Sequence, residues 1–253
     1  MQNKTFTITL GDVAENHKGM QKIGEKCNEG FNLDDLLMAK KYFNDCETEL
    51  IKLNTLIKDD SEDAYLLIVR NGLKYILPEK YIVDDFFNEQ DKLKKDTKCF
   101  MYGRVVNKHA RYNLCFSEIG QEPNYDKGKG SIISYKDVPL LDYVIKKIPD
   151  IIGEKGMYLK AEGNYYYDIS KTGISPHGDS ERLKVIGIRV GESLPLHFHW
   201  YHQCKPIGDT LKLILNHGDI YFMSEKTTGF DWKCRSKITL RHCAGCDKYL
   251  KFE

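Results

Sequence analysis

The sequence predicts an α+β fold, with an N-terminal α/β extension at residues 1–95 and a β-sandwich or barrel at residues 96–253. From Gly156 onward, short strand-like runs alternate with turns, which is typical of antiparallel β proteins. A charged segment at residues 79–100 precedes this part of the chain and is the best candidate for a boundary. A chain of 253 residues is long enough for one large domain or for a domain with such an extension.

The individual elements follow from local signals. Asn32 is an expected N-cap for a helix from Leu33 to Phe43, and residues 64–70 form a buried-strand run. Asn71-Gly72 predicts a hairpin turn into a returning strand at residues 73–77. Pro139, in the first turn after Asp137, predicts a helix to about Lys147. The later strands are expected at residues 157–160, 164–167, 183–190, 196–201, 210–215, 219–223 and 238–241.

Composition excludes several classes of protein. Hydrophobic residues make up 41% of the chain, enough for a core, and the formal net charge of +1 gives no global attraction to nucleic acid or membrane. The sequence shows neither a membrane-spanning apolar run nor a signal-peptide pattern. Its eight cysteines lack regular spacing and are expected to be reduced thiols. We therefore expect an intracellular protein of the cytoplasm or nucleus, without membrane association.

The strongest functional motif is His177-Gly-Asp179. Side chains two residues apart on an extended segment face the same side, so the motif directs an imidazole and a carboxylate to one point. These are two of the three ligands of the 2-His-1-carboxylate triad, which holds Fe(II) with positions left open. Arg235 and Arg241, six residues apart on a later strand, also share a face, and arginine suits a dicarboxylate. Together the motifs predict an iron site that uses 2-oxoglutarate.

A second functional candidate is the segment at residues 102–130. Arg104, Lys108 and Arg111 are interleaved there with aromatic residues such as Tyr112. Basic groups contact phosphates while aromatic faces stack on exposed bases. An ordinary pair of strands with a charged outer face explains the same composition, so both interpretations stay open.

Taken in order, these motifs resemble those of the AlkB-like Fe(II)/2-oxoglutarate-dependent dioxygenases, from about residue 100 to residue 250. His177-Gly-Asp179 is similar to the family's proximal metal motif, and Asn164-Tyr-Tyr166 to its Asn-x-Tyr element. His217-Gly-Asp219 is similar to a Gly-Asp turn before a core strand. Arg235-Ser-Lys-Ile-Thr-Leu-Arg241 is similar to the terminal Arg-x-Asn-x-Thr-x-Arg motif, with lysine in place of asparagine.

The resemblance implies a double-stranded β-helix, or jelly roll, as the core, and oxidation of alkylated nucleobases or related groups as the activity. It also implies that Arg235 pairs with the distal carboxylate of 2-oxoglutarate and that Arg241 lies near the metal. Glu181 falls where an acidic residue reads a base's exocyclic amine, and residues 102–130 fall where such enzymes carry a nucleotide-recognition lid. The residues implied to bind 2-oxoglutarate are Asn164, Tyr166, Arg235 and Arg241.

The family's distal histidine is missing from its usual place between Gly218 and Arg235. His242 is one candidate for the third ligand, although strand alternation directs it away from its neighbour Arg241 unless a bulge intervenes. Asp231 is a second candidate, which would give a one-histidine, two-carboxylate set suited to harder cations. A degenerate site without metal is the third possibility. We favour His242.

Two other clusters have simpler explanations. His197 and His199 share a strand face, as the ligands of a cupin would, but a polar strand face explains them as well. Cys243 and Cys246 form a single Cys-x-x-Cys, and a structural zinc site would need two more ligands from distant sequence.

The sequence thus predicts a dioxygenase dependent on Fe(II) and 2-oxoglutarate that hydroxylates or demethylates a nucleobase in DNA or RNA. Nucleic acid is the expected partner, and the target base would be single-stranded or flipped out of a duplex. Two alternatives stay open. One is a jelly-roll nucleic-acid-binding module with a lapsed metal site, and the other is a protein or small-molecule hydroxylase of the same chemistry.

Overall fold

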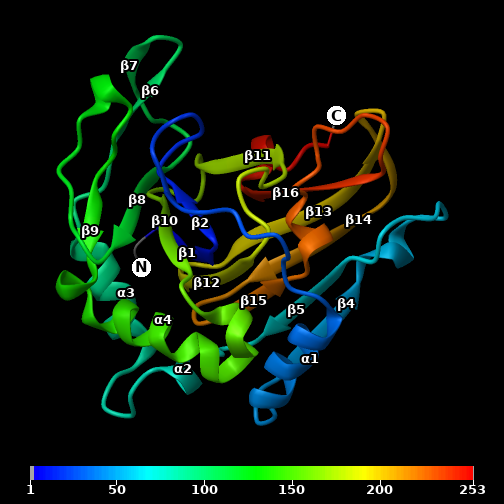
Figure 1. Ribbon diagram of the computed structural model, residues 1–253, viewed down its shortest axis with the longest axis horizontal. Coiled ribbons are helices and arrows are strands. Elements are labelled where there is room, and N and C mark those ends of the chain that lie inside the picture. The colour runs from blue at the N-terminus through cyan, green and yellow to red at the C-terminus, as the bar shows by residue number, and fades with distance from the viewer. Residues whose placement is uncertain (1–2, 253) are drawn as a thin grey trace.

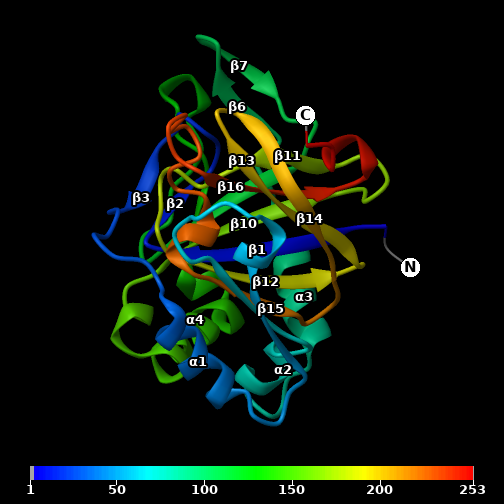
Figure 2. The same ribbon diagram turned by 90° about the vertical axis from the view of Figure 1, so that its right-hand side faces the viewer.

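Strict alternation of threonine with large apolar residues in Thr5–Gly11 builds the central strand of the molecule, β1. Alternate side chains of a strand point to opposite faces of the sheet. Phe6, Ile8 and Leu10 therefore pack against the helices, while Thr7 and Thr9 face a second sheet. The computed structural model describes residues 3–252, and Figure 2 shows β1 running across its middle.

Two sheets stack face to face. The larger sheet contains β1, β4 (Thr48–Lys52), β5 (Tyr65–Val69), β8 (Tyr112–Ser117), β9 (Ile132–Ser134), β10 (Lys160–Tyr166), β12 (Val185–Gly191) and β15 (Ile220–Met223). Its order is β4-β5-β15-β12-β1-β10-β8-β9, and every neighbouring pair is antiparallel except β8 and β9. The smaller sheet, of order β11-β16-β13-β14, contains β11 (Gly173–His177), β13 (Leu194–His202), β14 (Lys205–Leu215) and β16 (Thr239–Gly245). Two hairpins lie apart from these sheets, namely β2 (Val13–Glu15) with β3 (Lys22–Gly24), and β6 (Lys98–Met101) with β7 (Arg104–Asn107).

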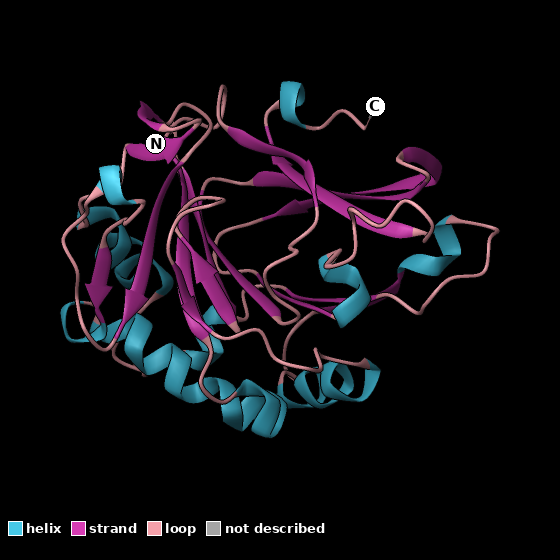
Figure 3. Cartoon of the chain, turned by 45° about the horizontal axis from the view of Figure 1, so that its top comes forward, coloured by secondary structure: helices cyan, strands magenta, loops and turns pink. Residues whose placement is uncertain are grey.

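Helices cover the outer face of the larger sheet, along the lower edge of Figures 1 and 3. They are α1 (Leu33–Tyr42), α2 (Leu73–Ile76), α3 (Val83–Lys92) and α4 (Pro139–Ile152). The predicted cap of α1 is confirmed, because the Asn32 side chain accepts a hydrogen bond from the Asp35 amide. Short 3₁₀ turns occupy Leu53–Leu56, Tyr125–Lys127, Tyr135–Asp137, Gly153–Gly156, Glu225–Thr228 and Asp247–Tyr249. No helix among residues 3–252 has the length and apolar character needed to cross a membrane.

The layers enclose two hydrophobic cores. One lies between the helices and the larger sheet and includes Phe86, Leu141 and Phe222. The other lies between the two sheets and includes Phe198 and Trp200. The space between the sheets is therefore apolar toward β13 and β5, and becomes polar where the inward threonines of β1 replace aliphatic residues.

The expected mixed, strand-rich architecture is present, but two expectations need correction. Residues 1–95 are not a separate extension, because β1, β4 and β5 belong to the same sheet as β10, β12 and β15. Asn71-Gly72 does not form a hairpin, and α2 follows it instead of a strand. The reason is that β5 already has β4 and β15 as neighbours, so a returning strand would find both edges of β5 occupied.

Strand pairing is nested along the chain. β13 pairs with β14, β12 with β15, and β11 with β16, so each pair encloses the previous one. The next pair outward would join β10 to a strand that follows β16. β10 pairs instead with β1, and so the N-terminal strand occupies that place in the larger sheet.

Candidate metal centre

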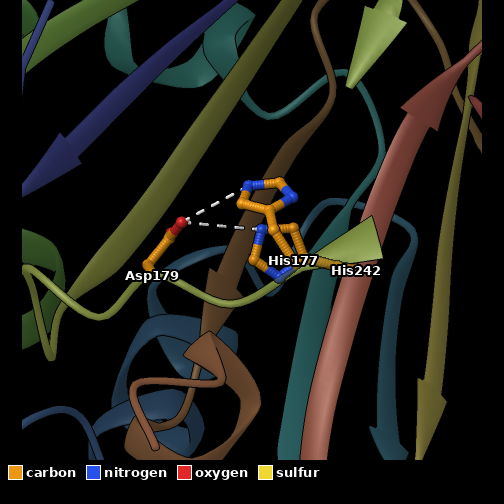
Figure 4. A group of neighbouring side chains, drawn as sticks. All are labelled: His177, Asp179 and His242. Atoms are coloured by element: carbon orange, nitrogen blue, oxygen red, sulfur yellow. Dashed lines mark ion pairs between the residues drawn. The ribbon is translucent and has the colours of Figure 1, made fainter. Parts of the chain in front are cut away.

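Three side chains converge between the sheets, as Figure 4 shows. His177 ends β11, and His242 lies opposite it in β16. Asp179 follows in the loop after β11, with Oδ1 at 3.6 Å from His177 Nε2 and 3.8 Å from His242 Nε2. One ligand atom from each residue lies within 4.8 Å of the other two, close enough for a single metal ion. Among the described residues, no other group of three or more histidine, cysteine or carboxylate side chains brings its ligand atoms this close together.

The loop that carries Asp179 is held by close backbone packing. A Cβ on Gly178 would lie 2.1 Å from the carbonyl oxygen of Gly229, so no larger residue fits there without displacing the backbone. The Asp179 amide also donates to the carbonyl of Thr228 at 2.9 Å. The segment where the distal histidine was expected thus supports the metal loop rather than supplying a ligand. Asp231 is not at the centre, because its Oδ2 binds Lys226 Nζ at 2.7 Å.

The surroundings of the two histidines favour the neutral form that a metal requires. His177 Nδ1 lies 2.9 Å from the carbonyl oxygen of Ser175, which only accepts, so Nδ1 carries the proton and Nε2 keeps its lone pair. Burial lowers the pKa of His177. Burial and the nearby His177 lower the pKa of His242 well below its usual range. Both shifts favour the neutral imidazole, which is the form that binds a metal.

Alternation along β16 explains why His242 reaches this centre. Leu240 and Ala244 pack in the core between the sheets, and His242 shares their face. Arg241 points the other way, where its guanidinium lies 3.9 Å from the ring centre of Tyr201 and 5.2 Å from that of Trp232. Because Arg241 does not face the proposed metal centre, His242 can face it without a β-bulge between the two residues.

The three ligands open into a cavity of about 200 Å³ between the sheets. The inner face of the larger sheet supplies its floor, with Thr7 and Thr9 from β1, Arg189 from β12 and Tyr221 from β15. A Cβ on Gly187 would lie 2.0 Å from the Tyr221 ring, so glycine at this position lets the ring lie across β12. The sequence-predicted residues that line the cavity are His177, Asp179, His242, Asn164, Tyr166, Arg111 and Glu181.

Sequence reasoning missed Arg189, which lies in the cavity wall with 1% of its surface exposed. Its Nε and Nη1 have no hydrogen-bond partner among the described residues, and no carboxylate there lies within ion-pair distance. The guanidinium carbon lies 5.6 Å from the ring centre of Tyr166, and burial lowers the pKa of the arginine. An arginine on the inward face of an otherwise apolar strand was the signal in the sequence that could have identified it.

Other cavity groups form an internal polar network. Arg182 Nη2 binds Glu162 at 2.7 Å and Glu181 at 3.0 Å. Asn164 Oδ1 accepts from Arg111 Nε at 2.6 Å and from Asn113 Nδ2 at 2.9 Å, so that amide is already engaged within the protein. His17, Glu15 and Glu162 also line the cavity and were not predicted to do so.

The remaining predicted site residues lie elsewhere. Arg235, expected to pair with the distal carboxylate of 2-oxoglutarate, and Arg241, expected near the metal, do not line the cavity, and Arg235 is exposed in the loop before β16. Lys108 is buried, and its Nζ binds Asn16 Oδ1 at 2.8 Å and Asn113 Oδ1 at 2.9 Å, so it cannot reach a phosphate.

Two residues of the predicted lid, one basic and one aromatic, lie at or near the surface. Arg104 is exposed and begins β7, and the Tyr112 ring stacks on Tyr167 with 4.4 Å between ring centres. Arg104 is therefore free for a partner, whereas one face of Tyr112 is already covered.

The second histidine cluster faces away from the centre. His199 Nδ1 lies 2.7 Å from Thr210 Oγ1, and its ring stacks on Phe252 on the outside of the smaller sheet. All eight cysteines, which lie within the described residues, carry free thiols. The Cys243 and Cys246 pair is not part of a three-ligand group there.

The fold and the site define a class of protein: two stacked β-sheets with a partly buried His-Asp-His group between them. No family model matches the chain. It is 47% identical over 254 residues to "Uncharacterized protein R156" of Acanthamoeba polyphaga mimivirus, an alignment that covers 98% of this chain and 98% of that protein. The chain therefore belongs to the same family as R156.

Proposed function

We propose that this protein is a dioxygenase dependent on Fe(II) and 2-oxoglutarate, built on a jelly roll whose closing strand comes from the N-terminus. Two four-stranded layers, β15-β12-β1-β10 and β11-β16-β13-β14, support the jelly-roll assignment. The nested pairs from β13·β14 outward are the pattern of a long hairpin folded over itself. β1 completes the fourth pair with β10 and thereby stands in for a strand after β16.

The observation that carries the proposal is the complete triad of His177, Asp179 and His242 in one cavity. Two imidazole nitrogens and one carboxylate oxygen are the donor set of non-haem Fe(II) oxygenases, a set that leaves coordination positions for other ligands. When bound, Fe(II) supplies the oxidative chemistry, in which 2-oxoglutarate, O₂ and a C–H bond become succinate, CO₂ and a C–OH group. His177, Asp179 and His242 would hold the ion at the wall of the cavity between the two sheets.

A nucleobase in DNA or RNA is the substrate we propose. Arg111 and Glu181, at the cavity wall, offer a donor and an acceptor to a heterocycle inserted from outside. Arg104 and the 88% exposed ring of Tyr102, on the β6–β7 hairpin, offer a cation and a stacking surface for the neighbouring strand. The completeness of the triad favours an enzyme over a lapsed binding module. A protein or small-molecule hydroxylase is the second candidate, because the same cavity chemistry serves it.

Succinate formation tests the activity. The purified chain is loaded with Fe(II) without oxygen, then given 2-oxoglutarate and air with or without N-methylated oligonucleotides. We expect succinate from the wild type, faster with the correct substrate, and formaldehyde if an N-methyl group is removed. His242→Ala should abolish it. His199→Ala is the matched control, because that histidine is as buried as His242 but faces outward. Equal succinate from both variants would refute the proposal.

A further inference from the structure

Arg189 is a buried cation without an anion. Of the two arginines that line the cavity with at most 3% of their surface exposed, Arg182 is neutralised by Glu162 and Glu181. Arg189 forms no ion pair with any described residue, and its Nε and Nη1 lack hydrogen-bond partners. An isolated buried charge is unfavourable, so a folded protein keeps one where a ligand supplies the countercharge.

We infer that Arg189 is the anchor for the distal carboxylate of a dicarboxylate co-substrate whose other end reaches the triad. This inference rests on the proposed function, and it assigns the role to a strand that carries neither Arg235 nor Arg241. Arg189 and the three ligands line one cavity, so a single small molecule can contact both.

The neighbours of Arg189 fit a carboxylate. Thr7 lies directly opposite it across β1 and β12, and the buried Thr7 Oγ1 also lacks a partner. A hydroxyl and a guanidinium together satisfy both oxygens of one carboxylate. Tyr166 and Tyr221 also line the cavity, and the guanidinium carbon of Arg189 lies 5.6 Å from the ring centre of Tyr166.

In the proposed jelly roll, the strand that pairs with β10 is β1, from the N-terminal end of the chain. This accounts for the position of the cation, Arg189, on β12. β1 presents only uncharged side chains to the cavity, namely Thr7 and Thr9. Arg241, which precedes His242 in β16, points away from the cavity, and Arg235 is exposed in the loop before that strand. The adjacent strand β12 is therefore the one that brings an arginine to this end of the floor, in register with Thr7.

The test compares ligands that differ only at the distal end. Calorimetry on Mn(II)-loaded protein measures the affinity for 2-oxoglutarate and for 2-oxopentanoate, which keeps the 2-oxo acid but lacks the second carboxylate. We expect the wild type to prefer 2-oxoglutarate by about 100-fold, as is usual when a buried charge loses its partner. Arg189→Met should reduce this preference to about threefold or less, and Arg189→Lys should retain part of it. Arg241→Met is the matched control and should keep it, because that guanidinium lies on Tyr201 outside the cavity.

The outcomes separate the anchor from the proposed function. If Arg189→Met binds Mn(II) normally and still prefers 2-oxoglutarate as strongly as the wild type, the anchor assignment is wrong while the metal centre stands. Loss of the preference in Arg241→Met alone would also overturn it. If the wild type binds no Mn(II), the proposed function fails, and glutarate then tests the anchor on metal-free protein. Glutarate should raise the melting temperature of the wild type but not of Arg189→Met, and an equal rise in both would refute the anchor.

Discussion

Replacing Arg189 by methionine should stabilise the protein without ligand. The side chain is 1% exposed and has no counter-ion among the described residues, and a buried unpaired charge costs about 3 kcal/mol or more. Its loss also removes the contact with Tyr166, where the cation lies 5.6 Å from the ring centre, an interaction of about 1 kcal/mol. Methionine fills similar space with apolar atoms. The net expectation is a gain of about 2 kcal/mol.

Urea unfolding and calorimetry measure this gain in buffer free of carboxylates. For a chain of this length, about 2 kcal/mol corresponds to a rise in melting temperature of about 4–8 °C. With 2-oxoglutarate at about 100 times its dissociation constant, the wild type should gain about 2.7 kcal/mol and overtake the variant. The reasoning is refuted if Arg189→Met is less stable than the wild type without ligand, or if the ligand stabilises both equally.

Three further predictions concern other parts of the molecule. Gly187→Ala should cost about 3 kcal/mol in urea unfolding because its Cβ meets the Tyr221 ring at 2.0 Å, whereas Gly120→Ala, with 3.4 Å to its nearest neighbour, should change stability by less than about 0.5 kcal/mol. Burial lowers the pKa of Lys108 to about 8, so the cost of its buried charge is fully present below pH 8 and is relieved as pH rises toward 10.5. The stability of the wild type relative to Lys108→Met should therefore rise by about 2 kcal/mol between pH 8 and 10, and a flat difference would contradict this. Arg104→Ala should weaken oligonucleotide binding and lower its salt slope by about one, while Lys108→Met should leave the slope unchanged; no effect of Arg104 would remove the β6–β7 hairpin from the interface.

The three residues of the proposed metal centre could be anticipated from the sequence because their signals are local. His177-Gly-Asp179 needs only an extended backbone to direct both side chains to one point. His242 could be proposed from its position, but placing Arg241 in the same centre conflicted with strand alternation. The structure removes that conflict, because Arg241 faces outward onto Tyr201.

The position of β1 could not be read from its residues. Its alternating pattern identifies a strand with one apolar face, but pairing with β10 and β12 joins residues that are 149 to 186 positions apart in the chain. Local propensity does not encode such pairing, and so residues 1–95 seemed separable.

Burial of charged residues was the other source of error. Arg189 was taken as part of an apolar strand and Lys108 as part of a basic surface, yet both are buried. Burial of a charged side chain depends on the segment that packs over its strand. For Arg189 this is the second sheet, and for Lys108 it is the loop that carries Asn16.

The central claim is that His177, Asp179 and His242 together hold one divalent metal ion. Titration of the metal-free chain with Mn(II), followed by electron paramagnetic resonance of the free ion, measures both stoichiometry and affinity. One ion should bind per chain, and His242→Ala should weaken binding by at least about 10-fold, with His199→Ala unchanged. A wild type that takes up no Mn(II), or a His242→Ala variant that binds it as tightly as the wild type, would contradict the claim.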